Sequence, residues 1–451
     1  MNLAPKSFSR FRSPLKSPKP LSFSRLALAT TATVAFYLSG MGPGARAELK
    51  DSPKAVLDEA WQIVNRDYVD PTFNKNNWQT IRQELLSKNY TSREEAYKAL
   101  RGALEKLEDP YTRFMNPKQY EALTSQTSGE MSGVGMRLEE DKETKIVQVV
   151  EPVEDSPAMK AGIKPGDRIL QVDGKSTKGM TVADVAQMIR GAVGTPVTLR
   201  LGRNKQPDFD VTLTRTRIQL QAVRYNLKED GGKRVGYIHL QEFSSHSGEQ
   251  MQKAIGKLLE QNAQAFVLDL RGNPGGLLRV SIDIARMWMD EGAIVSTVDR
   301  DGKSQEVKAS HRALTDLPLV VLVDDNSASA SEILAGALKD NKRAVVMGGQ
   351  TFGKALVQSV HSLSDGSGLA VTIAHYYTPN GTDISHKGIT PDVKVELTEA
   401  DKSLLSDDPK LIATMKDPVY ARAIGLLTAN KLTPPLAVNE KLPVKVKPQN
   451  Q

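Results

Sequence analysis

The stretch from Asp324 to Gln358, DDNSASASEILAGALKDNKRAVVMGGQTFGKALVQ, decides how the rest of the chain is interpreted. It follows an apolar run, Leu319 to Val323, that is typical of a buried strand. Small hydroxyl residues then lead directly into a helical pattern, and a Gly-Lys pair follows a second apolar segment. Open α/β sheets place their reactive groups at the carboxyl ends of strands. We therefore predict an α/β core in which Ser329 and Lys354 are candidate reactive residues.

Ser329 has two local interpretations. With Glu332 three residues later it fits a capping box, which is the commoner reason for a serine before a helix. The same position also surrounds the hydroxyl with free backbone N–H groups, such as that of Ala330, that could stabilise an oxyanion. The local sequence leaves both interpretations open.

Lys354 is flanked by Phe352, Gly353, Ala355 and Leu356, an apolar setting in which burial would lower the pKa of its amine and make it a base. The alternative is a surface lysine with only its aliphatic stem covered. Gln358 is four residues further on, which is near one helical turn and also an even number of strand steps. We therefore expect Gln358 to share the face of Lys354 and to orient it.

The first 47 residues are basic and are expected to be an export signal. Seven Lys and Arg residues, with no acidic residue, surround an apolar segment from Leu26 to Met41 and precede Ala45-Arg46-Ala47. A retained N-terminal anchor is the alternative. Removing these charges cancels the formal net charge of +7, so the basic composition does not support nucleic-acid binding.

The residue inventory narrows the chemistry. The chain contains no cysteine, which excludes disulfides, a thiol nucleophile and a cysteine-based zinc site. None of the six histidines lies in the segments 270–276 or 324–331 that follow the two most apolar strands, and no metal-binding or nucleophile-elbow motif is present. We expect neither a metal nor another cofactor. A Ser-His-Asp triad assembled from distant residues remains an alternative.

The chain changes texture along its length. Residues 48–128 have helical periodicity and are expected to form a packing module, and residues 129–217 alternate short strands with turns. Within the second region, Gly133-Val134-Gly135, Ser156-Pro157-Ala158 and Gly166-Asp167-Arg168 resemble a PDZ domain of the bacterial type. A glycine-rich loop beside an exposed strand edge can hold the carboxylate of an extended peptide. The resemblance implies that Gly133, Val134, Gly135 and Arg168 bind a C-terminus.

From residue 218 to residue 430, apolar strands alternate with helices, which predicts the α/β core; residues 431–451 are expected to be a flexible tail. Three motifs in this core resemble the carboxyl-terminal processing proteases, which are Ser/Lys peptidases with an embedded PDZ domain. These motifs are LDLRGNPGG at 268–276, NSASASEILAGALK at 326–339 and GKALVQ at 353–358. The resemblance extends from Glu59-Ala60-Trp61 through Asp109-Pro110-Tyr111 to Gly388-Ile389.

The resemblance implies a crotonase-like core and a role for each matching residue. Ser329 would be the nucleophile, Lys354 the general base and Gln358 the residue that orients it. Gly275 and Ala330 would supply the oxyanion N–H groups. The charged residues that match supporting positions are Asp269, Arg271 and Glu332.

The expected function is an exported endopeptidase, in the thylakoid lumen or the periplasm, that cleaves proteins with a free C-terminus. Residues 59–70, EAWQIVNRDYVD, resemble the photosynthetic branch, which trims the precursor of a photosystem II reaction-centre protein. We expect a monomer that associates peripherally with the membrane holding its substrate. The alternatives are a non-catalytic PDZ chaperone or scaffold and a general periplasmic tail-specific protease.

Overall fold

A computed structural model describes residues 52–141 and 144–429. The predicted export signal and the predicted C-terminal tail lie outside the described residues. The chain divides into two units, 1–52 and 53–451, and every element below belongs to the second. In the part of the chain that the structure describes, no helix has the length and apolar character needed to cross a lipid bilayer.

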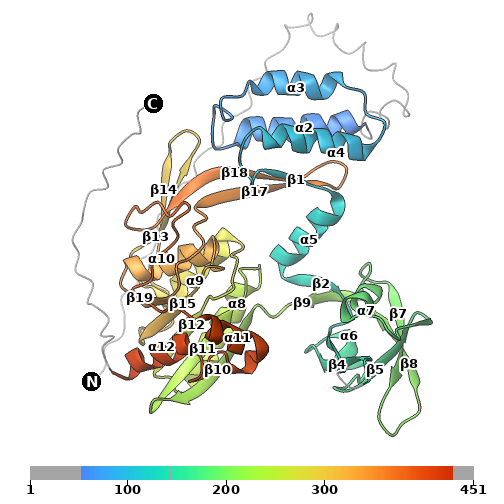
Figure 1. Ribbon diagram of the computed structural model, residues 1–451, viewed down its shortest axis with the longest axis vertical. Coiled ribbons are helices and arrows are strands. Elements are labelled where there is room, and N and C mark those ends of the chain that lie inside the picture. The colour runs from blue at the N-terminus through green and yellow to red at the C-terminus, as the bar shows by residue number, and fades with distance from the viewer. Residues whose placement is uncertain (1–51, 142–143, 430–451) are drawn as a thin grey trace, which may run out of the picture. The chain divides into compact units, whose positions relative to one another are not determined.

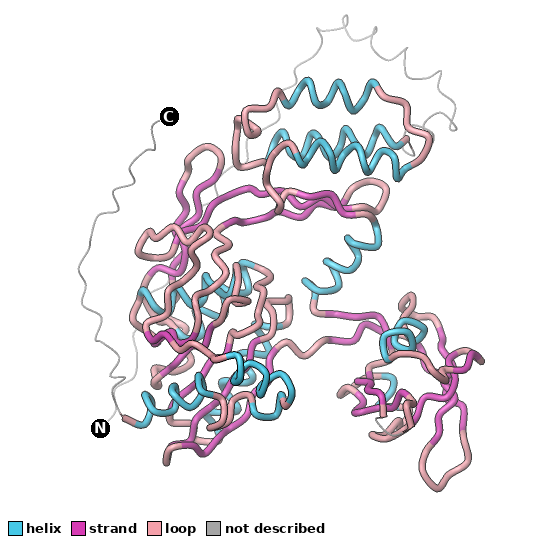
Figure 2. The backbone as a smooth tube through the Cα atoms, viewed as in Figure 1, coloured by secondary structure: helices cyan, strands magenta, loops and turns pink. Residues whose placement is uncertain are grey.

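The first module of this unit is helical, as its periodicity predicts. It contains α2 (Pro53–Asp67), α3 (Trp78–Ser87) and α4 (Arg93–Glu105). Ser92 caps α4, because its hydroxyl accepts a hydrogen bond from the N–H of Glu95 at 3.2 Å. The apolar faces of these helices pack together and against Leu369 and Val371 of a neighbouring sheet. Figures 1 and 2 show the three helices on one side of that sheet.

The neighbouring sheet is antiparallel and combines segments that are far apart in the sequence. Its strands are β1 (Arg113–Met115), β13 (Ala293–Asp299), β14 (Ser304–Lys308), β17 (Leu356–Ser362) and β18 (Gly368–Tyr377). The long strand β18 pairs with β1, β13 and β17. Lys354 lies two residues before β17, so this sheet links the helical module to the Gly-Lys segment.

Helix α5 (Pro117–Ser128) leads from β1 towards the PDZ-like region. Two short strands, β2 (Glu130–Gly133) and β9 (Thr216–Gln219), pair where the chain enters and leaves that region. Its sheet contains β3 (Met136–Glu140), β4 (Val147–Pro152), β5 (Arg168–Val172), β6 (Lys175–Ser176), β7 (Pro196–Gly202) and β8 (Phe209–Thr214). Helices α6 (Pro157–Lys160) and α7 (Val182–Ile189) accompany this sheet. Ala158 and Val185 from these helices contribute to its apolar core.

The α/β core is built on a second, mostly parallel sheet. In spatial order its strands are β10 (Val223–Asp230), β11 (Lys233–Leu240), β12 (Ala265–Asp269), β15 (Leu319–Val323), β16 (Val345–Gly348) and β19 (Val393–Lys394). Only β10 runs antiparallel to its neighbour. The apolar residues of β12 and β15 are completely buried because helices cover both faces.

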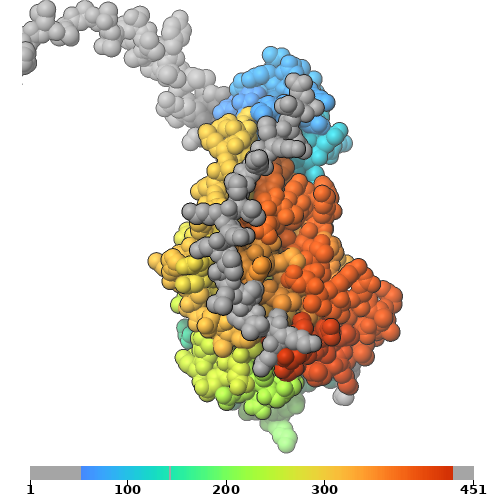
Figure 3. Space-filling model, turned by 90° about the vertical axis from the view of Figure 1, so that its left-hand side faces the viewer, coloured from blue at the N-terminus to red at the C-terminus, as the bar shows by residue number. Residues whose placement is uncertain are grey.

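The two faces of this sheet have different partners. Phe266 and Leu268 of β12 pack in the cluster that contains α8 (Ser247–Glu260), α9 (Leu278–Trp288) and α10 (Ala330–Asp340). The alternate residues, Ala265 and Val267, pack with α12 (Pro418–Thr428). Two short helices, α11 (Glu399–Asp407) and η1 (Pro409–Leu411), precede α12. Figure 3 shows these C-terminal segments in red on the surface of the core.

The predicted mixed α/β class, with a helical module, a PDZ-like region and an α/β core, is confirmed. Both strands β12 and β15 end at the same edge of the parallel sheet. The loops after them therefore meet, and the candidate site is built there.

Candidate functional site

Ser329 occupies a strained turn between strand β15 and helix α10. Its backbone angles are φ 54° and ψ −113°, in a region that residues with a side chain rarely adopt. Such strain persists only where the surrounding structure imposes it, and it is concentrated at functional sites. A strained strand-to-helix turn is also how many hydrolases expose a nucleophilic serine. The backbone of Ser329 therefore differs from that of an ordinary helix cap.

The carboxylate of Glu332 holds this turn and the Gly-Lys segment together. The side chain is completely buried, and its Oε2 accepts hydrogen bonds from the backbone N–H groups of Ser329 at 2.8 Å and of Lys354 at 2.9 Å. Its Oε1 accepts from Thr351 Oγ1 at 2.6 Å and from Gly353 N at 2.7 Å. One carboxylate oxygen is thus shared by the two candidate reactive residues, which fixes their backbones side by side.

Glu332 also makes one half of the capping box that the sequence suggested. It accepts the N–H of Ser329, whereas its own N–H donates to the carbonyl oxygen of Ser329 at 2.8 Å. A second tie comes from Tyr376 on β18, whose hydroxyl donates to the carbonyl oxygens of both Ser329 and Lys354. The backbone N–H and the backbone carbonyl oxygen of both Ser329 and Lys354 are therefore hydrogen-bonded.

The amine of Lys354 lies in a partly buried setting. Burial and the nearby Arg113 lower the pKa of Lys354, while Asp109 and Glu332 oppose that shift. Its Nζ lies 4.5 Å from the centroid of the Tyr111 ring. No hydrogen bond between Lys354 Nζ and Ser329 Oγ is found among the described residues. Catalytic contacts are often long in the absence of substrate, so the geometry is compatible with a base that engages on binding.

Gly275, to which the family resemblance assigns an oxyanion N–H group, lies against the Ser329 turn. A side chain at this glycine would come within 2.7 Å of the Ala328 carbonyl oxygen and 3.0 Å of Ala330 N, and its φ of 104° also disfavours other residues. Its own N–H donates to Asn273 Oδ1 at 2.9 Å. Serving an oxyanion would require Gly275 to release that bond. Ala330 N begins helix α10, where backbone N–H groups are unpaired by the helix itself.

Asn273, for which the sequence predicted no separate role, links the loop after β12 to the loop after β15. Its side chain is buried and donates to Leu240 O at 2.8 Å. Its carbonyl oxygen accepts hydrogen bonds from Ala328 N at 3.1 Å and Ser331 Oγ at 2.9 Å. The loop after β12 is thus attached directly to the loop that carries Ser329.

Asp269 and Arg271 form a buried ionic network behind this loop. Burial alone would raise the pKa of Asp269, but the adjacent Arg271 guanidinium holds it below its ordinary value. Arg271 Nη2 contacts Asp269 Oδ2 at 2.7 Å and Asp417 Oδ2 at 2.8 Å. Tyr237 donates its hydroxyl to Asp269 Oδ2 at 2.8 Å. The network joins the loop to the start of α12 and makes no contact with Ser329 among the described hydrogen bonds.

Gln358 lies on β17, opposite Thr372 of β18. Lys354 precedes the start of β17, so alternation along that strand does not determine whether Gln358 shares the face of Lys354. Its Nε2 is buried without a hydrogen-bond partner among the described residues. An unpaired buried donor can serve a ligand or a neighbouring side chain, but no described hydrogen bond joins it to Lys354.

In the PDZ-like region, the predicted peptide-binding residues lie in two places, the loop that follows β2 and the start of β5. Gly133 ends β2, and Val134 O accepts the N–H of Ala158 at 2.9 Å. Gly135 has a φ of 77°, and its carbonyl oxygen accepts the hydroxyl of Ser156 at 3.0 Å. Arg168 begins β5, and its Nε is buried with no hydrogen-bond partner in the part of the chain that the structure describes. No described hydrogen bond joins Arg168 to the glycine loop.

The helical module contributes to this site, which its sequence does not indicate. Its periodicity predicts packing for residues 48–128, whereas Tyr111, Asp109 and Arg113 from that module all act on Lys354. These residues belong to the Asp-Pro-Tyr motif, which carries part of the family resemblance but no chemistry of its own. Asp417 was also not predicted, because nothing in the local pattern around a helix-capping aspartate indicates a distant arginine partner.

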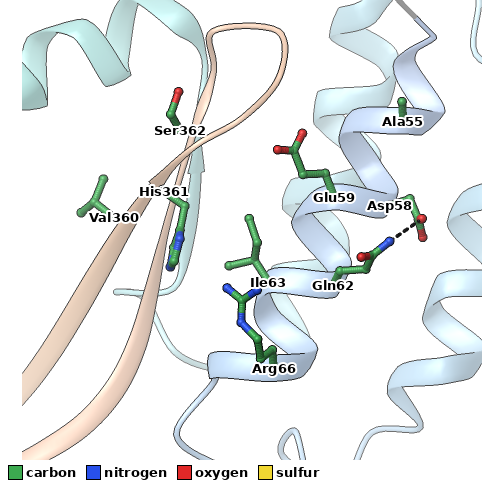
Figure 4. A pocket seen from close by; sticks show the side chains of 9 residues that line it. All are labelled: Ala55, Asp58, Glu59, Gln62, Ile63, Arg66, Val360, His361 and Ser362. Atoms are coloured by element: carbon green, nitrogen blue, oxygen red, sulfur yellow. Dashed lines mark hydrogen bonds between the residues drawn. The ribbon is translucent and has the colours of Figure 1, made fainter. Parts of the chain in front are cut away.

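A separate groove lies between α2 and β17. It has a volume of about 680 Å³ and is lined by Ala55, Asp58, Glu59, Gln62, Ile63, Arg66, Val360, His361 and Ser362. Figure 4 shows the α2 side chains on one side of the groove and the β17 side chains on the other. None of the predicted site residues lines it, so it is distinct from the Ser329 site.

Comparison with known proteins agrees with this architecture. Residues 234–395 match the model of peptidase family S41, and residues 148–203 match a PDZ domain model. These two matches cover most of the α/β core, including Ser329 and Lys354, and most of the PDZ-like region.

Similar proteins extend the match over nearly the whole chain. A carboxyl-terminal-processing protease from Picosynechococcus sp. is 43% identical over 86% of this chain and 93% of its own length. The chloroplastic carboxyl-terminal-processing peptidase 2 of Arabidopsis thaliana is 40% identical over 80% of this chain and 72% of its own length. A solved structure named photosystem II D1 C-terminal processing protease is 38% identical over 76% of this chain and 93% of its own, with a TM-score of 0.48. The chain therefore belongs to the carboxyl-terminal-processing proteases of peptidase family S41.

Proposed function

We propose that this protease is a serine-type endopeptidase with Ser329 as nucleophile and Lys354 as general base. The observation that carries the proposal is the buried Glu332 carboxylate, one oxygen of which binds the backbone N–H of both residues. The strained backbone of Ser329 and the lowered pKa of Lys354 support it. A histidine base is less well supported, because Glu332 ties the Ser329 backbone to the Gly353-Lys354 segment and accepts no described hydrogen bond from a histidine.

The proposed reaction begins when neutral Lys354 takes the proton of Ser329 Oγ while Oγ bonds to the substrate carbonyl carbon. The peptide C–N bond then breaks, and the lysine ammonium gives its proton to the leaving amine. Water attacks the acyl-enzyme with Lys354 again acting as base, which releases the shortened protein and restores Ser329. Gly275 and Ala330 would donate N–H groups to the oxyanion, and Gln358 would orient the amine.

The PDZ domain is proposed to deliver the substrate. The loop of Gly133, Val134 and Gly135 would bind the C-terminal carboxylate through backbone N–H groups, with Arg168 supplying positive charge. The substrates would then be proteins with a free C-terminus. Amidating the C-terminus of a test peptide should therefore raise KM, and an unchanged KM would contradict capture by this domain.

The most direct test incubates the protein with a peptide that has a free C-terminus and uses mass spectrometry to find a new terminus. We expect Ser329→Ala and Lys354→Ala each to lower kcat at least about a thousandfold with thermal unfolding unchanged, because each removes a group that takes part in bond making. The controls Ser364→Ala and Lys387→Ala alter exposed residues of the same types and should cleave normally. Near-normal cleavage by Lys354→Ala would overturn the dyad, and no cleavage by the wild type would favour the non-catalytic PDZ scaffold.

The pH dependence offers an independent check on the base. Only the neutral amine of Lys354 can accept the serine proton, so kcat/KM should rise with pH through the pKa of Lys354. Because burial lowers that pKa, the rise should be complete at a lower pH than an ordinary lysine allows. Modification of histidines should leave the rate unchanged, and strong inhibition would revive the triad alternative.

The proposed location is the thylakoid lumen or the periplasm, reached through the export signal at residues 1–47. The proposed substrate is the photosystem II reaction-centre precursor, on the resemblance of residues 59–70 to the photosynthetic branch and on the cyanobacterial and chloroplast relatives. The protein would act as a monomer at the surface of the membrane that holds this substrate. In a strain lacking the protein, mass spectrometry should find that reaction-centre protein with its extension uncut. A normal C-terminus there would favour a general tail-specific protease.

A further inference from the structure

The face of one aromatic ring covers the amine of Lys354. Its Nζ lies 4.5 Å from the ring centroid of Tyr111, which is within the range at which a cation interacts with an aromatic face. The ring belongs to the loop between α4 and β1, whereas the lysine lies more than 240 positions later in the chain. The contact is thus a tertiary one that the fold creates next to the proposed dyad.

Both partners are fixed by the same strand, β18. Tyr111 N donates to Asp109 Oδ1 at 2.9 Å, Asp109 Oδ2 accepts the hydroxyl of Thr112 at 2.7 Å, and Thr112 Oγ1 accepts the N–H of Thr372 on β18 at 3.0 Å. On the other side, Tyr376 of β18 donates its hydroxyl to Lys354 O. The backbones that carry the ring and the lysine are therefore both tied to the same strand of the sheet.

The charged groups that face Lys354 come from both of these segments and from α10. Asp109 and Glu332 favour its protonated form, and Arg113 and burial oppose it. Both carboxylates are already engaged by other donors, Asp109 by Tyr111 N and Thr112 Oγ1 and Glu332 by four N–H or O–H groups. Burial raises the pKa of the Tyr111 hydroxyl, so the ring stays neutral. Among the described residues, the Tyr111 ring face is thus the group that contacts the amine itself.

We propose that Tyr111 is a positioning residue that stabilises the ammonium form of Lys354 while the lysine carries the proton taken from Ser329. A base that becomes charged in a partly dry site needs a group that favours the charge, and the negative face of an aromatic ring supplies this without a counter-ion. The ring also limits where the amine can lie. This inference rests on the proposed Ser/Lys dyad and assigns a catalytic contribution to the helical module.

The test compares Tyr111→Phe with Tyr111→Leu in the full-length protein, using cleavage of a free C-terminal peptide across a range of pH. Phenylalanine keeps the ring face, so kcat and the pH profile should remain within about twofold of the wild type. Leucine keeps the apolar cover but removes the face, so kcat should fall about tenfold. The acid limb of kcat/KM should also move to lower pH by about one unit, because the protonated lysine loses a stabilising contact.

The control is Tyr225→Leu, which alters an exposed tyrosine on β10 and should change neither kcat nor the pH profile. If Tyr111→Leu does not fold, phenylalanine analogues with increasing ring fluorination at position 111 should lower kcat step by step, since fluorine weakens the negative face. A uniform loss of rate with an unmoved acid limb, or an equal loss in Tyr111→Phe, would overturn the inference. If Ser329→Ala or Lys354→Ala still cleaves, the dyad itself fails, which is a different result.

Discussion

Two completely buried carboxylates, those of Glu332 and Asp417, are partnered in opposite ways. Asp417 faces a cation, because both of its oxygens accept from the guanidinium of Arg271. Glu332 accepts four hydrogen bonds from neutral donors, three of them backbone N–H groups. Asp417 joins two elements through an ion pair, whereas Glu332 holds a loop through hydrogen bonds from uncharged groups.

The difference bears on the proposed chemistry. A second guanidinium at Glu332, added to the Arg113 that already lowers the pKa of Lys354, would further repel the ammonium that forms during the proposed proton transfer, so a clamp made of neutral donors suits a lysine base. The Arg271 network, by contrast, makes no described hydrogen bond to Ser329 or Lys354, so a guanidinium there does not oppose the proposed proton transfer. Changing each carboxylate to its amide tests this distinction with one chemical change at two places.

The largest effect on stability is expected for Asp417→Asn. The change removes one of the two negative partners of buried Arg271 and turns an N-cap acceptor of α12 into a weaker one. We expect the free energy of unfolding to fall by about 3–5 kcal/mol, the usual result of breaking a buried ion pair. Denaturant unfolding measures this, and activity per folded molecule should fall less than tenfold. A loss no greater than that of Arg279→Ala, which removes the exposed Arg279–Asp283 pair, would contradict the importance of the network.

Glu332→Gln should destabilise less and inactivate more. The amide group must present N–H donors to two of the present donors, which leaves buried groups unsatisfied and costs about 1–3 kcal/mol. Because the Ser329 and Lys354 backbones lose their shared acceptor, we expect kcat per folded molecule to fall at least about a hundredfold. Unfolding and single-turnover cleavage of the same sample separate the two effects. Equal kcat values for Glu332→Gln and Asp417→Asn would contradict the claim that Glu332 matters more than Asp417 for cleavage.

The smallest effect is expected for Tyr237→Phe, which tests whether the ionic network of Asp269, Arg271 and Asp417 influences catalysis. The change deletes only the hydroxyl that donates to Asp269 at 2.8 Å and leaves Arg271 in place. We expect a loss of about 1 kcal/mol in unfolding free energy, typical of one hydrogen bond, and unaltered kcat. A fall in kcat comparable to that of Glu332→Gln would mean that the network acts on the reacting groups.

Much of the core could be predicted because its local and global signals agree. The continuous apolar run Leu319–Val323 forms the expected buried strand with the expected bounds. The loops after β12 and β15 meet because parallel neighbours end at one edge of a sheet. Both features follow from local apolar patterning and from the order of strands and helices along the chain.

The remainder depends on contacts that no local pattern encodes. The sheet containing β1 and β18 joins residue 113 to residue 370, and through it Tyr111 approaches Lys354. Gln358 lies on β17, whereas Lys354 precedes that strand, so an argument from alternation does not relate the two side chains. The Gly275 N–H is engaged by Asn273, an interaction of two neighbouring residues that sequence spacing could not distinguish from a free donor.

The backbone of Ser329 has a consequence for how this position can change over generations. At φ 54° and ψ −113° a side chain is disfavoured, so the fold alone would accept glycine there more readily than serine. Under the proposed mechanism, stability and cleavage therefore act in opposite directions on this residue. Once the hydroxyl is no longer required for cleavage, glycine at position 329 would be favoured over serine by the backbone alone.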